Sequence, residues 1–192
     1  MSDDAFSPFS GLLDRETALA TLRDAVAGAD DGELFLERRR SEALMFDDGR
    51  LKTASYDASE GFGLRAVRGE VTGYAHSTEI SDKALRRAAE TARLAVAEGG
   101  GTLAEAPVLT NRRLYTDDDP IAGAAFPVKV ETLREIDDFL RSLDSRVVQV
   151  SASIAASIQE VEILRPEGGS TRDTRPMTRV HVSVIVEEDG RR

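Results

Sequence analysis

The chain has 192 residues, of which 41% are hydrophobic, and its formal net charge at pH 7 is −10. This composition excludes wholesale disorder, and the absence of cysteine excludes disulfides and a cysteine nucleophile within these residues. The acidic charge argues against nucleic-acid binding, because nucleic-acid-binding proteins normally carry a basic face. The start of the chain lacks a signal-peptide pattern and no stretch has the length of a transmembrane helix, so we expect a cytoplasmic protein.

The N-terminal region is predicted to contain a helix, a β-meander and a second helix. The first helix is expected from Asp14, whose carboxylate can cap it, to about Ala27. Strands are predicted over residues 33–37, 42–46, 50–56, 61–67 and 71–76, and the short turns between them indicate antiparallel pairing. The basic run Arg38-Arg39-Arg40 is interpreted as a solvated strand end.

The second helix is expected to open at the capping residue Ser81, with Ile80 and Leu85 placed to contact each other across the cap. Its inner face is predicted to be a narrow, alanine-rich stripe made by Leu85, Ala88, Ala92 and Ala95 or Val96. Such a stripe would let the helix lie close to a sheet.

A loop-like segment from Thr102 to about Val128 marks a domain boundary, so we expect a first domain over residues 1–105 and the start of a central domain over 106–192. Beyond the loop, Leu133, Ile136, Leu140 and Leu143 follow a helical period. Strand-like patterns return at residues 148–156 and 159–164, and a closing strand alternates Val180, Val182, Val184 and Val186 with mostly polar residues. Asp189-Gly190 predicts a hairpin turn after it.

The predicted fold class is therefore α+β. We expect an antiparallel β-meander packed with flanking helices, followed by a helix and antiparallel strands of a second, incomplete domain.

The residues themselves present no catalytic, cofactor-binding or metal-binding constellation. The two histidines, His76 and His181, each lie on a predicted strand without a second ligand beside them. Gly61, Gly63 and Gly69 lack the spacing of a phosphate loop, and we interpret Gly61 and Gly63 as positions where a strand bends or another backbone approaches. The acidic clusters at residues 47–48 and 117–119 fit turns and caps better than a cation site.

Residues 57–76, DASEGFGLRAVRGEVTGYAH, resemble the N-terminal signature of TldD members of the TldD/PmbA (TldD/TldE) metallopeptidase family. Three further stretches, at residues 46–52, 114–120 and 182–190, are similar to family segments in the same order. The resemblance spans residues 33 to 192. It carries over Gly61, Phe62, Gly63, Arg65 and Gly69 as structural signature residues.

The resemblance implies a cytoplasmic zinc metallopeptidase whose TldD-type subunit pairs with a TldE/PmbA-type subunit to degrade or process unfolded and small peptides. The family has also been labelled a modulator of DNA gyrase. Its zinc motif, His-Glu-x-x-x-His, has no counterpart here, because no His-Glu pair occurs in the chain. No catalytic residue can therefore be carried over. Zinc is expected only for the full-length protein, and this chain is expected to be inactive alone.

Two explanations remain open for the missing motif. The simplest is a truncated form or gene fragment. The other is a natural short paralogue, which is disfavoured because it would leave the valine strand as an exposed, aggregation-prone edge. The alternative function is a non-catalytic interaction module that binds a TldE/PmbA-like subunit or another protein. Modulation of gyrase is a third possibility, which the dispersed acidic charge disfavours.

Overall fold

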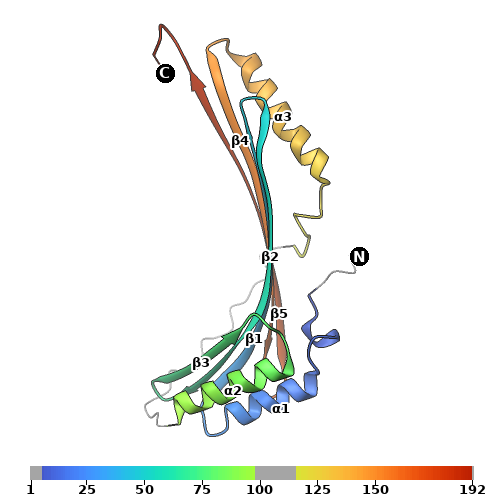
Figure 1. Ribbon diagram of the computed structural model, residues 1–192, viewed down its shortest axis with the longest axis vertical. Coiled ribbons are helices and arrows are strands. Elements are labelled where there is room, and N and C mark those ends of the chain that lie inside the picture. The colour runs from blue at the N-terminus through green and yellow to red at the C-terminus, as the bar shows by residue number, and fades with distance from the viewer. Residues whose placement is uncertain (1–5, 98–115, 192) are drawn as a thin grey trace. The chain divides into compact units, whose positions relative to one another are not determined.

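The computed structural model describes residues 6–97 and 116–191, which form three α-helices and a five-stranded antiparallel sheet (Figure 1). The strand order is β3-β2-β1-β4-β5, so β3 and β5 are the edge strands. This arrangement confirms the predicted α+β fold class. No helix in the described part of the chain combines the length and the apolar character that crossing a membrane requires.

The elements follow the chain in this order: a 3-10 turn at Pro8–Ser10, α1 (Arg15–Ala25), β1 (Asp31–Asp47), β2 (Arg50–Arg68), β3 (Val71–Ser77), α2 (Asp82–Val96), α3 (Phe126–Leu143), β4 (Val147–Leu164) and β5 (Ser170–Val186).

The chain divides into two compact units, each assembled from three segments. Unit 1 comprises residues 1–38, 59–114 and 160–174, and unit 2 comprises residues 39–58, 115–159 and 175–192. The divisions fall inside β1, β2, β4 and β5, so each of these strands contributes residues to both units. The domain boundary predicted near residue 105 lies outside the described residues, and the domains 1–105 and 106–192 remain a prediction.

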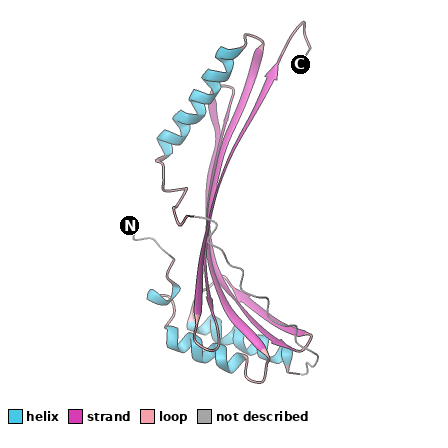
Figure 2. Cartoon of the chain, turned by 180° about the vertical axis from the view of Figure 1, so that it is seen from behind, coloured by secondary structure: helices cyan, strands magenta, loops and turns pink. Residues whose placement is uncertain are grey.

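In unit 1, α1 and α2 lie side by side against one face of the sheet (Figures 1 and 2). Both helices begin at the predicted caps: the Asp14 carboxylate accepts a hydrogen bond from the Thr17 amide at 2.8 Å, and the Ser81 hydroxyl accepts one from the Ala84 amide at 3.2 Å. The predicted stripe of α2 is buried, with Val96 rather than Ala95 as its last member. Small side chains let α2 approach β3 closely.

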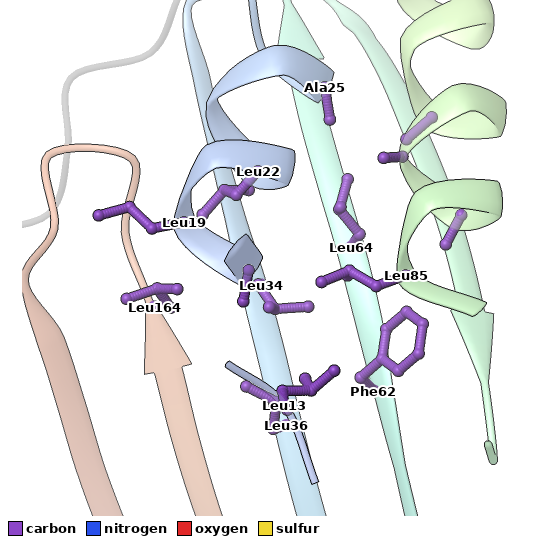
Figure 3. Close-up of a cluster of buried hydrophobic side chains, with 14 of the residues drawn as sticks. Leu13, Leu19, Leu22, Ala25, Leu34, Leu36, Phe62, Leu64, Leu85 and Leu164 are labelled. Carbon is purple, nitrogen blue, oxygen red and sulfur yellow. The ribbon is translucent and has the colours of Figure 1, made fainter. Parts of the chain in front are cut away.

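The core of unit 1 lies between these helices and the sheet. Leucines from both layers meet there, as Figure 3 shows for Leu22 of α1, Leu34 and Leu36 of β1, Leu64 of β2 and Leu85 of α2. All five are fully buried. Burial of apolar side chains of this size stabilises a fold by about 1.5–3 kcal/mol each, so this cluster anchors unit 1.

The predicted breaks inside the meander are wrong. Residues 33–37 and 42–46 belong to one strand, β1, and residues 50–56 and 61–67 belong to β2. The two runs at 148–156 and 159–164 likewise form the single strand β4. The physical reason is that the polar residues between the apolar runs include no proline and no turn-forming pair, so extended backbone continues while the buried face changes.

The interpretation of Arg38-Arg39-Arg40 as a solvated strand end is also wrong. These arginines lie in the middle of β1. Arg38 forms an ion pair with Glu160 at 2.9 Å, and Arg40 pairs with Asp119 at 3.0 Å. The side chains of both arginines are mostly buried. Paired carboxylates therefore let cationic residues continue a strand that hydropathy alone would interrupt.

In unit 2, α3 packs Leu133 against Leu44 and Phe46 of β1 and Ala152 of β4. Its predicted apolar period holds only in part, because Leu143 is 64% exposed. The inward face instead includes two buried charged residues. Lys129 pairs with Glu42 and donates to the Ile121 carbonyl at 2.6 Å, and Asp137 accepts from Arg141 at 2.9 Å. The helix followed by antiparallel strands was predicted for this region and is confirmed.

β5 is the exposed edge strand beside β4. Its valines at 180, 182, 184 and 186 are 38–56% exposed. The turn predicted at Asp189-Gly190 is confirmed, because both residues have positive φ, at 51° and 75°. Glu188 and Arg191 flank them in an antiparallel bridge with two hydrogen bonds of 2.9 Å. Positive φ at both central residues is the geometry of a two-residue β-hairpin.

Candidate functional site

Unit 1 carries a pocket of about 270 Å³ on the strand face opposite α1 and α2. The alternation of strand side chains produces it: Leu34 and Leu36 of β1 enter the core, so Phe35 and Glu37 point the other way. The same alternation places Gly61 and Gly63 of β2 on the pocket face. The complete lining is Phe35, Glu37, Ser59, Glu60, Gly61, Phe62, Gly63, Tyr74, His76, Ser77 and Thr78.

The two glycines form a floor without side chains. A Cβ at Gly61 would lie 2.6 Å from the Ser77 carbonyl oxygen, so glycine lets the β3 backbone approach, as the sequence suggested. A Cβ at Gly63 would lie 2.6 Å from the Tyr74 hydroxyl oxygen and 2.9 Å from a ring carbon. The Tyr74 ring therefore lies over Gly63, whose direct partner in the β2–β3 register is His76.

Aromatic side chains form one wall of the pocket. The rings of Tyr74 and His76 stack with centroids 5.7 Å apart and planes inclined by 28°. Tyr74 is 59% exposed, so most of its ring is open to solvent or to a bound group. Together with Phe35, these rings give the pocket flat, polarisable surfaces.

The remaining signature residues make contacts inside unit 1. Phe62 is buried in the core. Arg65 forms ion pairs of 3.1 Å with both Asp31 and Glu33 on β1. Gly69 has a φ of 59° in the β2–β3 turn, and its amide donates to the Asp30 carboxylate at 2.7 Å. These contacts position β1 and β2 beneath the pocket.

The structure does not bring the two histidines into a metal site. His76 lines the pocket of unit 1, whereas His181 lies on the exposed strand β5 in unit 2. Within residues 6–97 and 116–191, no group of three or more histidine, aspartate or glutamate residues is placed to hold a metal ion. The described residues therefore do not fit the zinc that the resemblance implies for the full-length protein.

Asp119 caps a turn and Asp48 has the positive φ of one, whereas Asp47 accepts hydrogen bonds from β4. The Asp119 carboxylate accepts hydrogen bonds from the amides of Ile121 and Ala122 at 2.8 and 3.2 Å. Asp47 accepts from the Ser151 hydroxyl and then the Gln149 amide, and these hydrogen bonds lower the pKa of its carboxyl. Such contacts stabilise the ionised form of the Asp47 carboxylate.

Sequence reasoning did not single out Phe35, Glu37, Glu60 and Tyr74. The available signal was the alternation in β1 and β3, where aromatic and acidic residues occupy the positions between buried ones. What the sequence could not indicate is that β1, β2 and β3 place these residues around the same two glycines. That arrangement depends on strand register.

Comparison with known proteins shows that two domain models of one metallopeptidase family match this chain. Residues 32–96 match the family model for PmbA/TldA metallopeptidase domain 1, and residues 119–192 match the PmbA/TldA metallopeptidase central domain. The chain is 31% identical over 164 residues to a metalloprotease TldD homologue of Buchnera aphidicola and 32% identical over 166 residues to one of Haemophilus influenzae. Each match covers 85% of this chain but 34% of the relative, so the chain spans about a third of the relatives' length.

Solved structures share the fold at low sequence identity. A Thermotoga maritima protein labelled as a modulator of DNA gyrase superposes with a TM-score of 0.72 at 13% identity, over 91% of this chain and 40% of that one. A Bacteroides thetaiotaomicron protein with the same label gives 0.71 at 12% identity, over 94% and 43%. TldE from Thermococcus kodakarensis gives 0.68 at 14% identity, over 91% and 40%. At these identities the likeness concerns the fold alone.

Proposed function

Because this chain belongs to the PmbA/TldD metallopeptidase family, we propose that it is the N-terminal part of a TldD-like zinc metallopeptidase subunit. The observation that carries the proposal is the 31–32% identity to metalloprotease TldD homologues over 85% of this chain. The whole protein, in the cytoplasm, pairs with a TldE/PmbA-like subunit and degrades or processes small or unfolded peptides. The TldE structure with the same fold supports the idea that the two subunits are built alike.

Within this proposal, the described residues supply the framework and not the chemistry. They include no group of ligands suited to a metal ion. Zinc and the residues that use it therefore belong to the remainder of the full-length protein, and we assign no catalytic step to this chain. The contribution of residues 6–97 and 116–191 is a sheet that carries helices and an open pocket.

The proposal is tested by comparing the 192-residue chain with the full-length protein, each co-expressed with a TldE/PmbA-like subunit. We expect the full-length pair to contain stoichiometric zinc by mass spectrometry and to cleave an unstructured fluorogenic peptide. The short chain is expected to do neither. Stoichiometric zinc in the 192-residue chain, or a full-length pair without zinc-dependent cleavage, would contradict the proposal.

The same experiment distinguishes the peptidase subunit from the alternative function, a non-catalytic interaction module. Co-purification of the 192-residue chain with the TldE/PmbA-like subunit, combined with a full-length pair that cleaves no peptide, would favour a non-catalytic interaction module. A direct effect on gyrase through DNA stays disfavoured by the net charge of −10, because acidic surfaces repel the phosphate backbone.

A further inference from the structure

We infer that the pocket between β1, β2 and β3 binds the cationic end of an arginine or lysine side chain of a peptide. The pocket is the 270 Å³ hollow of unit 1, with Gly61 and Gly63 as its floor. Three of its properties support this assignment: its charge, its aromatic wall and its size. Only the description of the ligand as part of a peptide rests on the proposed function.

The charge of the pocket is one-sided. Glu37 of β1 lies on the pocket face, and no lysine or arginine lines the pocket. Glu60 of β2 also belongs to the lining, but it alternates with Gly61, so its side chain points towards the opposite face of the strand. The Glu37 carboxylate forms no ion pair or side-chain hydrogen bond with another residue of the described ranges. The nearest signature cation, Arg65, is held by Asp31 and Glu33 at 3.1 Å. A cationic ligand would thus meet the free Glu37 carboxylate, whereas an anionic ligand would be repelled by it.

The aromatic wall suits a cation as well as an apolar group. The face of an aromatic ring carries negative electrostatic potential and attracts ammonium and guanidinium groups within about 6 Å of its centroid. Tyr74 is 59% exposed and stacked on His76, so the pair offers an extended, pre-arranged surface. A guanidinium can stack on such a surface while its N–H groups face a carboxylate.

The size of the pocket limits what can enter. Pockets for complete small-molecule ligands measure about 300–1,000 Å³, and this one lies just below that range at 270 Å³. One long side chain fits this description better than a whole cofactor. Gly63 leaves room for the Tyr74 ring against β2, so this glycine helps to position the aromatic wall.

The inference is tested by nuclear magnetic resonance titration of the 192-residue chain with N-acetyl-arginine amide, N-acetyl-lysine amide and N-acetyl-citrulline amide. Citrulline has nearly the shape of arginine but no charge. We expect the two cations to shift the backbone amide signals of Gly61, Gly63 and His76, and arginine to bind at least about fivefold more tightly than citrulline. Binding of arginine at these residues, tighter than that of citrulline, supports the inference, whether or not lysine also binds.

A matched pair of variants isolates the carboxylate. Glu37→Gln is expected to weaken arginine binding about fivefold, because it removes one charge from the pocket and preserves shape. Glu70→Gln removes the same charge from an exposed turn of unit 1 outside the pocket and should leave the affinity unchanged. The amide spectrum of each variant reports whether the fold is intact.

Equal binding of arginine and citrulline, shifts confined to other residues, or an affinity that Glu37→Gln leaves unchanged would each overturn the inference. The titration needs neither zinc nor peptide cleavage. A full-length protein that lacks zinc-dependent cleavage while the pocket still prefers arginine would therefore reject the proposed function alone.

Discussion

Gly73 marks the point where β3 meets α2. An added Cβ there would lie less than 3.0 Å from the Ala92 carbonyl oxygen and 3.1 Å from the Ala95 Cβ. The first of these atoms belongs to helix backbone, which cannot turn aside as a long side chain can. The glycine thus sets how closely the alanine-rich stripe of α2 approaches the sheet.

We predict that Gly73→Ala destabilises the protein by about 1–3 kcal/mol, because the new methyl group forces α2 away from β3. The measurement is urea unfolding followed by circular dichroism. Gly169→Ala is the control, since a Cβ at that glycine would meet no atom within 4 Å. Equal stability of Gly73→Ala and the parent chain would show that α2 relaxes without cost.

A second residue-scale prediction concerns Asp144, whose pKa is lowered to about 2 by hydrogen bonds from the Arg146 side chain and then the Arg146 amide. A carboxyl whose pKa is lowered in the folded state stabilises the fold at pH values above its ordinary pKa of 3.8. This contribution is lost as the pH falls from 3.8 through about 2.

Arg146→Gln is expected to return the pKa of Asp144 towards 3.8, because the guanidinium makes the first and largest contribution to the shift. Carbon-detected magnetic resonance titration of the carboxyl measures it. Arg134→Gln removes the same charge from α3, where Arg134 pairs with Glu131, and should not move the Asp144 titration. A carboxyl that still titrates near 2 in Arg146→Gln would contradict the assignment.

At the scale of the elements, β5 is an edge strand with exposed apolar side chains. It lies at the end of the strand order, and its valines between residues 180 and 186 are exposed. An edge strand with unpaired backbone groups and apolar side chains is a template for pairing with another chain. The sequence predicted an exposed valine edge, and the exposure of these side chains in the described residues agrees with that expectation.

We predict that Val182→Glu lowers self-association of the 192-residue chain, because a charge on an edge strand disfavours pairing with a second strand. Sedimentation velocity at increasing protein concentration would show a smaller share of oligomers. Thr91→Glu adds the same charge on an exposed position of α2 and should leave association unchanged. If both variants associate like the parent chain, β5 is not the surface involved.

At the scale of the whole molecule, two compact units share four strands, and each unit has its own apolar cluster. Neither cluster depends on a metal within the described residues. The metal dependence that we propose for the full-length protein should therefore be absent from the thermal stability of this chain.

We predict that excess EDTA leaves the melting temperature of the 192-residue chain unchanged and lowers that of the full-length protein, because metal bound only to the native state stabilises it by mass action. Differential scanning calorimetry measures both. EDTA already loaded with zinc is the control for effects of the chelator itself. A lower melting temperature for the short chain in free EDTA would reveal a metal site among these residues.

Several features were predictable from the sequence because they depend on near neighbours. Asp14 and Ser81 cap the two helices of unit 1, since a cap needs only a polar side chain three residues before a free amide. The turn at Asp189-Gly190 follows from the tolerance of these residues for positive φ. The α+β class and the family were equally accessible, because alternation, period and signature segments are local patterns.

Strand length was not predictable in this way, because it depends on partners distant in sequence. Arg38 continues β1 since Glu160 of β4 neutralises it, and these residues are 122 positions apart. Lys129 can enter the inward face of α3 because Glu42 meets it there. Local hydropathy treats such residues as exposed, whereas a buried partner reverses that expectation.

The sequence by itself therefore determined the fold class, the two helix caps of unit 1, the turn at Asp189-Gly190 and the family. Only the tertiary structure decided how far the strands run and that Glu37, Tyr74 and His76 meet beside Gly61 and Gly63. The physical reason is strand register: a shift of one residue would turn each of these side chains to the opposite face of the sheet. Register is set by long-range pairing and by core burial, which no local pattern records.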